Sequence, residues 1–271
     1  MKPVWLMVSG LCAISPASAE ERIPEPFRAS ASYEIRWSGL TVGEAEVMLE
    51  ENAGASALTL QTASTGVLDW IVNYRSRIES RSTRLGERVL ETRFRASRSL
   101  DGEAQDWTML FGEKGELVEF DMPSAIADEH EEVPPHLARG PDPLALAATV
   151  MSELSPGRRL DATSFDGKRA LALEMQCSDV EEEVAPLPER MPEPALVCEL
   201  DGQLLAGASK RWAKERQERE QSGREDDEDR GVRIWLSDSL LPGRRLPVLA
   251  HGRSRWGTVV ARLVAFSAER R

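Results

Sequence analysis

The stretch Tyr33–Leu49, YEIRWSGLTVGEAEVML, decides the fold class of this chain. Apolar Tyr33, Ile35 and Trp37 occupy every second position with charged residues between them, and the alternation resumes after Gly39. Period-two alternation is typical of strands with one buried face. We therefore expect two antiparallel strands joined at this glycine.

The same alternation recurs through both halves of the chain, which favours one β domain over residues 30–271 rather than two domains. We expect an all-β fold, an antiparallel open barrel or spiral curved sheet of about a dozen strands. Asp166-Gly167 and Gly202 read as turns of two hairpins. The further strands are expected at Leu58–Thr62, Ile78–Thr83, Leu90–Ala96, Trp107–Phe111, Leu117–Phe120, Arg159–Phe165, Arg169–Gln176, Val197–Leu200, Leu204–Trp212, Val232–Leu236, Leu246–His251 and Trp256–Phe266.

One α-helix is expected after Asp142, an N-cap residue followed by Pro143 at the first helical position. Apolar residues recur at helical spacing from Leu144 to Leu154, and Ser155-Pro156-Gly157 ends the run. Its apolar stripe needs a surface to cover, so we expect this helix to cap or plug the curved sheet. A shorter helical turn is predicted over Val67–Val72, with a buried strand as the alternative.

Two polar segments are expected outside the sheet. Met122–Gly140 is acidic and carries Pro134-Pro135, which predicts a long surface loop. Residues 210–230 form a charged insertion that we interpret as a solvated excursion between two strands.

The first nineteen residues have the pattern of a secretory signal peptide. Lys2 precedes a short apolar stretch, and Ala17-Ser18-Ala19 matches the small-residue cleavage pattern. We expect cleavage after Ala19, a flexible lead over residues 20–29, and a periplasmic location. A buried N-terminal helix and lipidation at Cys12 are the alternatives.

Cleavage would leave two cysteines, Cys177 and Cys198. A pair of cysteines in an exported chain predicts a disulfide, whose loop of roughly 20 residues would contribute about 3 kcal/mol in the chain-entropy model. The segment between them is acidic and proline-broken, and we expect no strand in it. Two unpaired thiols are the alternative.

Composition excludes several classes of function. The 271 residues carry 34 Lys and Arg against 46 Asp and Glu, a net charge of −12, which argues against a nucleic-acid partner. No apolar run of about 18 residues occurs, so no transmembrane helix is expected. Phosphate-loop and dinucleotide fingerprints are absent, and His130, His136 and His251 lie far apart without metal-binding spacing. We assign no catalytic residues, no metal and no cofactors.

The tryptophans give the only indication of a binding site. A curved sheet of a dozen strands encloses more space than side chains readily fill. Trp37, Trp70, Trp107 and Trp256, which lie on or beside expected strands, are therefore the candidate ligand-lining residues. A solid core is the alternative.

Several short pieces of the sequence form a recognisable series along the chain. They are Tyr33–Gly43, Thr65-Gly66 with Leu68-Asp69-Trp70, Asp142-Pro143-Leu144, Phe165–Arg169, Leu205-Ala206-Gly207, and Leu246-Pro247-Val248 leading to Gly257. In this order they resemble the DUF3108 family of bacterial exported proteins. The resemblance implies a cell-envelope β protein of no established activity, and it supplies no catalytic residues. The charged insertion and the acidic stretch between the cysteines depart from the family pattern.

Three functions follow as hypotheses. The first is a non-catalytic periplasmic protein that binds a hydrophobic or glycan-like ligand or supports cell-envelope integrity; its partners would be a lipid or glycan, or an envelope protein. The second is a hydrolase of envelope polymers, which requires a carboxylate pair about 5–10 Å apart. The third is a structural scaffold whose charged insertion docks a partner.

Overall fold

A computed structural model describes residues 26–270 except residues 87, 212–213, 215–230 and 255–256. The expected leader, most of the flexible lead and nearly all of the charged insertion lie outside these residues. Within the described part, no helix is both long and apolar enough to cross a bilayer.

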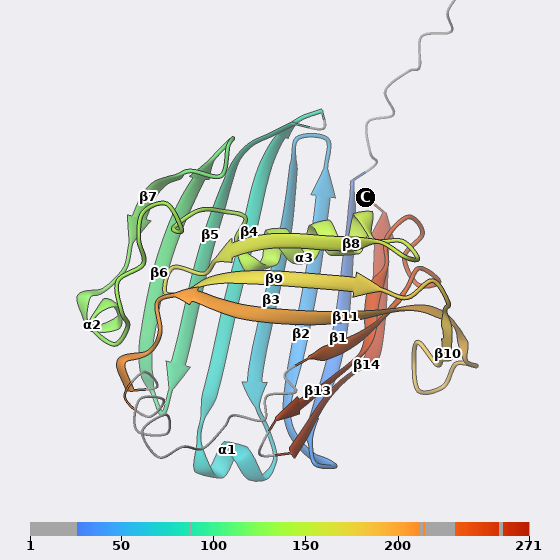
Figure 1. Cartoon of the computed structure of the whole chain (residues 1–271). Coiled ribbons are helices and arrows are strands. Elements are labelled where there is room, and N and C mark those ends of the chain that lie inside the picture. Colours follow the sequence, from blue (N-terminus) through green and yellow to red (C-terminus); the bar gives the residue numbers. More distant parts are fainter. Residues whose placement is uncertain (1–25, 87, 212–213, 215–230, 255–256, 271) are drawn as a thin grey trace, which may run out of the picture.

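The fold is one antiparallel sheet of fourteen strands that curls over on itself without closing (Figure 1). The strand order is β7-β6-β5-β4-β3-β2-β1-β14-β13-β12-β11-β9-β8. Strand β10 pairs with β11 but lies outside this order. The edge strands β7 and β8 do not pair with each other, so the sheet is open. The bounds are β1 Phe27–Trp37, β2 Leu40–Asn52, β3 Ala55–Ser64, β4 Tyr74–Leu85, β5 Arg88–Leu100, β6 Glu103–Gly112, β7 Leu117–Asp121, β8 Arg159–Phe165, β9 Ala170–Cys177, β10 Glu182–Val184, β11 Glu193–Ala206, β12 Val232–Ser237, β13 Leu246–Ser254 and β14 Gly257–Arg270.

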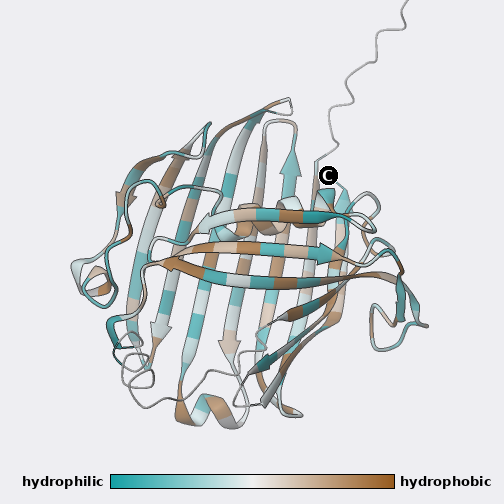
Figure 2. Cartoon of the chain, in the orientation of Figure 1, coloured by the Kyte–Doolittle hydropathy of each residue, from teal (hydrophilic) through white to brown (hydrophobic). Residues whose placement is uncertain are grey.

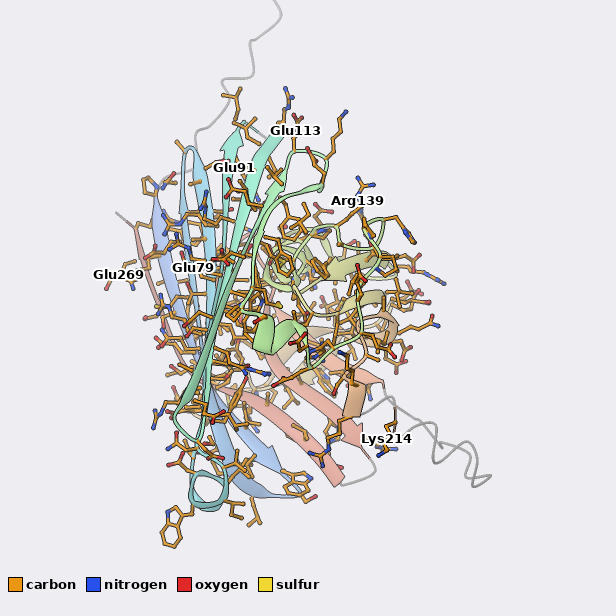
Figure 3. The ribbon with its side chains drawn as sticks, turned by 90° about the vertical axis from the view of Figure 1, so that its left-hand side faces the viewer. Glu79, Glu91, Glu113, Arg139, Lys214 and Glu269 are labelled. Carbon is orange, nitrogen blue, oxygen red and sulfur yellow. A yellow bond between two sulfur atoms is a disulfide. The ribbon has the colours of Figure 1, made fainter. Side chains whose placement is uncertain are left out.

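The sheet forms two layers because its second half folds back across its first. Strands β8, β9 and β11 cross in front of β1–β6, and helix α3, Pro143–Glu153, lies between the layers (Figure 1). Figure 3 shows the layers edge-on, with Glu79 and Glu91 on the first layer and Arg139 and Lys214 on the side of the second. The expected spiral sheet with one capping helix is confirmed.

Three apolar clusters fill the space between the layers. Leu49, Leu144 and Val248 belong to the cluster shared by β2, α3 and β13. Phe94, Met109 and Ile126 belong to the cluster over β5 and β6. Leu154, Leu196 and Leu236 belong to the third, beneath the end of α3. Brown and teal alternate along many strands in Figure 2, the pattern of a sheet with one buried face.

The two predicted helices are present. Asp142 is the N-cap of α3, and Pro143 is its first residue. The shorter prediction is α1, Val67–Ile71, between β3 and β4. The second layer lies against α3, so the helix is enclosed rather than lying over an open face.

Four local expectations were wrong. β1 begins at Phe27, so the last residues of the expected lead belong to the sheet. Gly202 is not a turn: it pairs with Leu173 inside one continuous strand, β11. The acidic segment between the cysteines does contain a strand, β10, because Glu182–Val184 pairs with Glu193–Ala195. The loop after β7 is not wholly superficial, since it contains α2, Ser124–Ala127, whose Ile126 is 1% exposed.

Candidate ligand-binding site

A candidate site lies where the first turns of α3 meet the concave face of β3–β6. Alternation directs Leu58, Ser80 and Thr92 onto this face, while their sequence neighbours point to the opposite face. Phe94 and Phe111 on β5 and β6 complete the apolar floor and are almost fully buried. The site is therefore built from strand residues with fixed directions.

A buried carboxylate positions the helix over this floor. Asp142 Oδ1 accepts hydrogen bonds from the backbone N–H groups of Leu144 and Ala145, both at 2.9 Å. Its Oδ2 accepts from Ser80 Oγ at 2.7 Å, which ties the helix start to β4. Burial raises the pKa of Asp142 and these hydrogen bonds oppose the rise, because they favour the charged form.

A pocket of about 340 Å³ opens between α3 and the strands. Apolar groups of Leu49, Leu58, Phe111 and Leu144 form its walls. Hydroxyl groups lie among them: Ser80 bonds to Asp142, and Ser82 and Thr92 bond to each other at 2.9 Å. A concave apolar pocket with a few placed polar groups is typical of sites for small ligands.

The mouth of the pocket is positively charged. Arg84, Glu113 and Lys114 line it. Arg88 holds the Glu113 carboxylate in an ion pair and lowers its pKa. Neither Arg84 nor Lys114 forms a side-chain ion pair with another described residue. Figure 3 places Glu113 at the upper end of the first layer, so this mouth faces solvent at that end.

Two other hollows have different chemistry. One of about 780 Å³ lies over the opposite face of β1–β5, where Glu34, Glu44, Arg75 and Arg77 border it. It is larger, but its border is charged and largely solvated, and its side chains point away from the core. The other, of about 420 Å³, lies beside the loop Leu240–Arg244. Neither combines buried apolar walls with convergent hydroxyl groups.

The structure does not bring the predicted tryptophans together. Trp107 is 9% exposed and packs in the core over β5 and β6. Trp37 and Trp70 are 40% and 92% exposed at the end of the strands away from the pocket, and so do not line it. Trp256 lies outside the described residues. The three described tryptophans therefore do not form one ligand-lining set.

A buried lysine that no sequence pattern indicates lies against Trp107. Lys168 is 7% exposed, and its Nζ is 3.8 Å from the Trp107 ring centroid. No described atom accepts a hydrogen bond from that Nζ. Desolvation, with a smaller contribution from Arg98, lowers the pKa of Lys168 to about 8. The cation–π contact helps hold the β8–β9 turn on the first layer.

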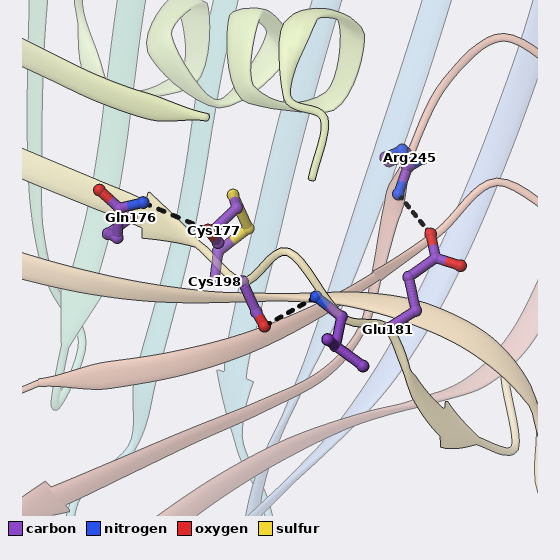
Figure 4. The surroundings of a disulfide bond; sticks show 7 residues. Gln176, Cys177, Glu181, Cys198 and Arg245 are labelled. Carbon is purple, nitrogen blue, oxygen red and sulfur yellow. Dashed lines mark hydrogen bonds and ion pairs between the residues drawn. A yellow bond between two sulfur atoms is a disulfide. The ribbon is translucent and has the colours of Figure 1, made fainter. Parts of the chain in front are cut away.

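The Cys177–Cys198 disulfide joins two neighbouring strands. The residues are register partners on β9 and β11, with Cα atoms 3.9 Å apart. Both are buried below α3, and an ion pair between Arg245 and Glu181 lies nearby (Figure 4). The predicted disulfide is present in the structure.

The described residues offer no cluster of His, Cys, Asp and Glu able to hold a metal ion. Among them Asp142 is the only buried carboxylate, and both of its oxygens are occupied by the hydrogen bonds given above. The described part of the chain therefore supplies no buried carboxylate pair of the kind that glycoside hydrolysis uses.

The sequence matches no family model and no curated protein. Its fold is similar to that of a β-barrel-like protein of the domain of unknown function DUF1849 from Brucella abortus, whose crystal structure is known. The TM-score is 0.52 at 11% sequence identity, over 90% of this chain and 98% of that one. At this identity the likeness concerns the fold alone.

Proposed function

We propose that this protein is a non-catalytic binding protein whose pocket between α3 and β3–β6 takes a single-chain amphipath with an anionic head group. The observation that carries the proposal is the mixed lining of this pocket. Leu58 lies level with Ser80 and Phe111 with Thr92, so apolar and hydroxyl groups share its inner part, and Arg84 and Lys114 line its mouth.

The volume limits the ligand. About 340 Å³ is at the lower end of the range for small-molecule sites, which accommodates one alkyl chain rather than a multi-chain lipid. Contact with the apolar walls would supply roughly 25 cal/mol per Å² of buried surface. The two cations at the mouth favour a carboxylate or phosphate over a neutral head group.

We further propose that the protein acts in the periplasm and supports the cell envelope. The signal-like leader and the disulfide favour an oxidising compartment. The short motifs that resemble the DUF3108 family favour the same location, and membership of that family is part of this proposal.

A hydrolase is the weaker candidate because the described residues contain no buried carboxylate pair. A scaffold role would depend on the charged insertion over residues 210–230, nearly all of which lies outside the described residues.

Calorimetric titration with lauric acid tests the proposal. We expect one site in the wild type and its loss in Ala148→Phe, which places a ring in the pocket from α3. Ser152→Phe, which puts the same side chain on an exposed position of the same helix, is the matched control and should bind normally.

A second variant keeps the test valid if Ala148→Phe disturbs folding. Arg84→Glu with Lys114→Glu reverses the charge at the exposed mouth and should weaken binding at least about tenfold, the equivalent of 1.4 kcal/mol. Wild type that does not bind laurate, or equal affinity in all variants, would refute the proposed function.

A further inference from the structure

The outer face of β1–β5, on the side away from α3, carries opposite charges on different strands. The positions that point outward are Glu44, Glu46, Met48 and Glu50 on β2, Ala63, Gln61, Thr59 and Ala57 on β3, and Arg75, Arg77, Glu79 and Arg81 on β4. In Figure 3 the second layer lies on the other side of these strands, so no described element covers this face. We call it the outer face.

Strand register places opposite charges of the outer face on the same rows of the sheet. Glu44 pairs with Ala63, which pairs with Arg75. Two further rows have the same pattern: Glu46 with Gln61 and Arg77, and Glu50 with Ala57 and Arg81. In each row the two charged residues are separated by two strand spacings, about 9.6 Å. Among the described residues, no ion pair joins β2 to β4.

This separation of charges is unfavourable within one chain. Glu34 and Glu44 are register partners on β1 and β2, and Arg81 and Arg93 are register partners on β4 and β5. Like charges directly opposite each other destabilise a sheet. Glu44 and Arg75 form no ion pair with any other described residue. Opposite charges brought from outside the chain would offset this repulsion.

We propose that two copies of the chain associate through the outer face, with a two-fold axis that runs along β3. Such an axis keeps every row level and places β2 of each copy opposite β4 of the other. Glu44 then faces the partner's Arg75, and Arg75 faces the partner's Glu44. The other two rows become complementary in the same way. A two-fold contact requires a surface that is self-complementary, and these rows have that property.

The charges of the outer face are nearly balanced, whereas the whole chain has a net charge of −12. The rows from Glu34 to Arg28 over β1–β5 carry Glu34, Glu44, Glu46, Glu50 and Glu79 against Arg28, Arg75, Arg77, Arg81, Arg93 and Arg95. Arg28 would face the partner's Arg93, which is unfavourable. These residues lie on the outer strands, which diverge because packed sheets are rotated by about 30°, and Glu50 already holds Arg28 in an ion pair at 3.3 Å.

The outer face has the area and the relief that such a contact needs. A strand spacing of about 4.8 Å and a rise of about 3.4 Å per residue give about 800 Å² over five strands and the 10 residues of β3. Stable interfaces bury about 800 Å² per partner. Gln61 and Ala63 line the hollow of about 780 Å³ between the acidic and basic strands. These small and neutral side chains leave room for charged side chains of the second copy.

Sedimentation velocity on the full chain tests the proposal at ionic strengths of about 0.01 M and about 1 M, where charges are screened over about 30 Å and about 3 Å. We expect a dimer in equilibrium with monomer at the lower ionic strength and monomer at the higher. Arg75→Glu with Arg77→Glu makes both halves of the face acidic, and Glu44→Lys with Glu46→Lys makes both basic. Each double variant alone should have a dissociation constant at least about a hundredfold higher than that of the wild type.

An equimolar mixture of these two variants should form a heterodimer, because each altered residue again faces an opposite charge. Arg158→Glu with Arg190→Glu is the matched control, since it makes the same change in net charge at exposed arginines outside the outer face. It should dimerise as the wild type does. All variants should keep the wild-type circular dichroism spectrum.

Four results would overturn the proposal: wild type that stays monomeric at the lower ionic strength, a charge variant that dimerises normally, equal loss in the control, or a mixture that stays monomeric. The outer face and the pocket lie on opposite sides of the strands, so the proposed function does not depend on the outcome.

Discussion

Replacement of Asp142 by alanine should destabilise the protein more than any surface substitution. The variant removes the acceptor of three hydrogen bonds, from Leu144 N–H, Ala145 N–H and Ser80 Oγ. Loss of an N-cap costs about 0.5–2 kcal/mol, and a buried hydroxyl left without its partner costs roughly 1–3 kcal/mol. We expect a loss of about 2–4 kcal/mol in the free energy of unfolding.

Asp142→Asn is the matched control because its side chain has the same shape. Its amide oxygen still accepts from Leu144 and Ala145, and Ser80 Oγ can accept from the amide nitrogen. Differential scanning calorimetry should show a decrease in Tm of about 4–16 °C for alanine, at 2–4 °C per kcal/mol in a domain of this size, and little change for asparagine.

The pH dependence gives an independent check. The folded pKa of Asp142 is raised above its unfolded value, so the folded state binds more protons in the interval between the two. Stability from this group is therefore greatest below the unfolded pKa and falls as pH rises through that interval. Asp142→Asn should lack this fall. Equal Tm values for alanine and wild type, or a loss in asparagine as large as in alanine, would refute the assigned role.

Three other substitutions test separate contacts. Cys177→Ala with Cys198→Ala should lower stability by about 3 kcal/mol through loss of the loop constraint, and urea unfolding under non-reducing conditions measures it. Lys168→Met removes an ammonium whose folded pKa is about 8 rather than 10.5. As pH rises from 8 to 10.5, the free energy of unfolding of the wild type should therefore increase by up to about 3 kcal/mol, and that of the variant should not. If the difference in free energy of unfolding between wild type and variant stayed constant across that interval, it would contradict the burial of the charge. Gly207→Ala should cost at least about 2 kcal/mol, because its φ is +82° and a Cβ would lie 1.9 Å from Lys168 O; a variant with wild-type Tm would disprove this close approach.

The strands were predictable because their signal is local. Tyr33, Ile35 and their neighbours alternate in polarity, and the pleat converts that alternation directly into two faces. The start of α3 was predictable for the same reason, since Asp142 and Pro143 act on the backbone next to them. These features depend little on the rest of the molecule.

The errors arose where tertiary pairing overrode a local signal. Asp201-Gly202 has the composition of a tight turn, but pairing with β9 holds it extended inside β11. Glu182–Val184 has a poor strand sequence, yet Trp235 Nε1 donates to Glu182 at 3.0 Å and Arg233 pairs with the same carboxylate. Partners from β12 therefore favour a strand that its own residues do not predict.

The site could not be read from the sequence because it depends on where α3 docks. Ser80 and Asp142 are 62 residues apart, and nothing local to either predicts their hydrogen bond. The prediction that the tryptophans line the site failed for a related reason. Trp37 follows Tyr33 and Ile35 at the correct period, but it lies at the strand end beyond the enclosed part of the concave face.

A crystal structure with 12-bromododecanoic acid tests the central claim most directly, since anomalous scattering locates the bromine without reference to the protein. The proposed function predicts bromine between Leu58, Phe111 and Leu144, with the carboxylate near Arg84 and Lys114. Bromine in the outer hollow beside Arg75 and Arg77, or none bound at saturating ligand, would contradict it.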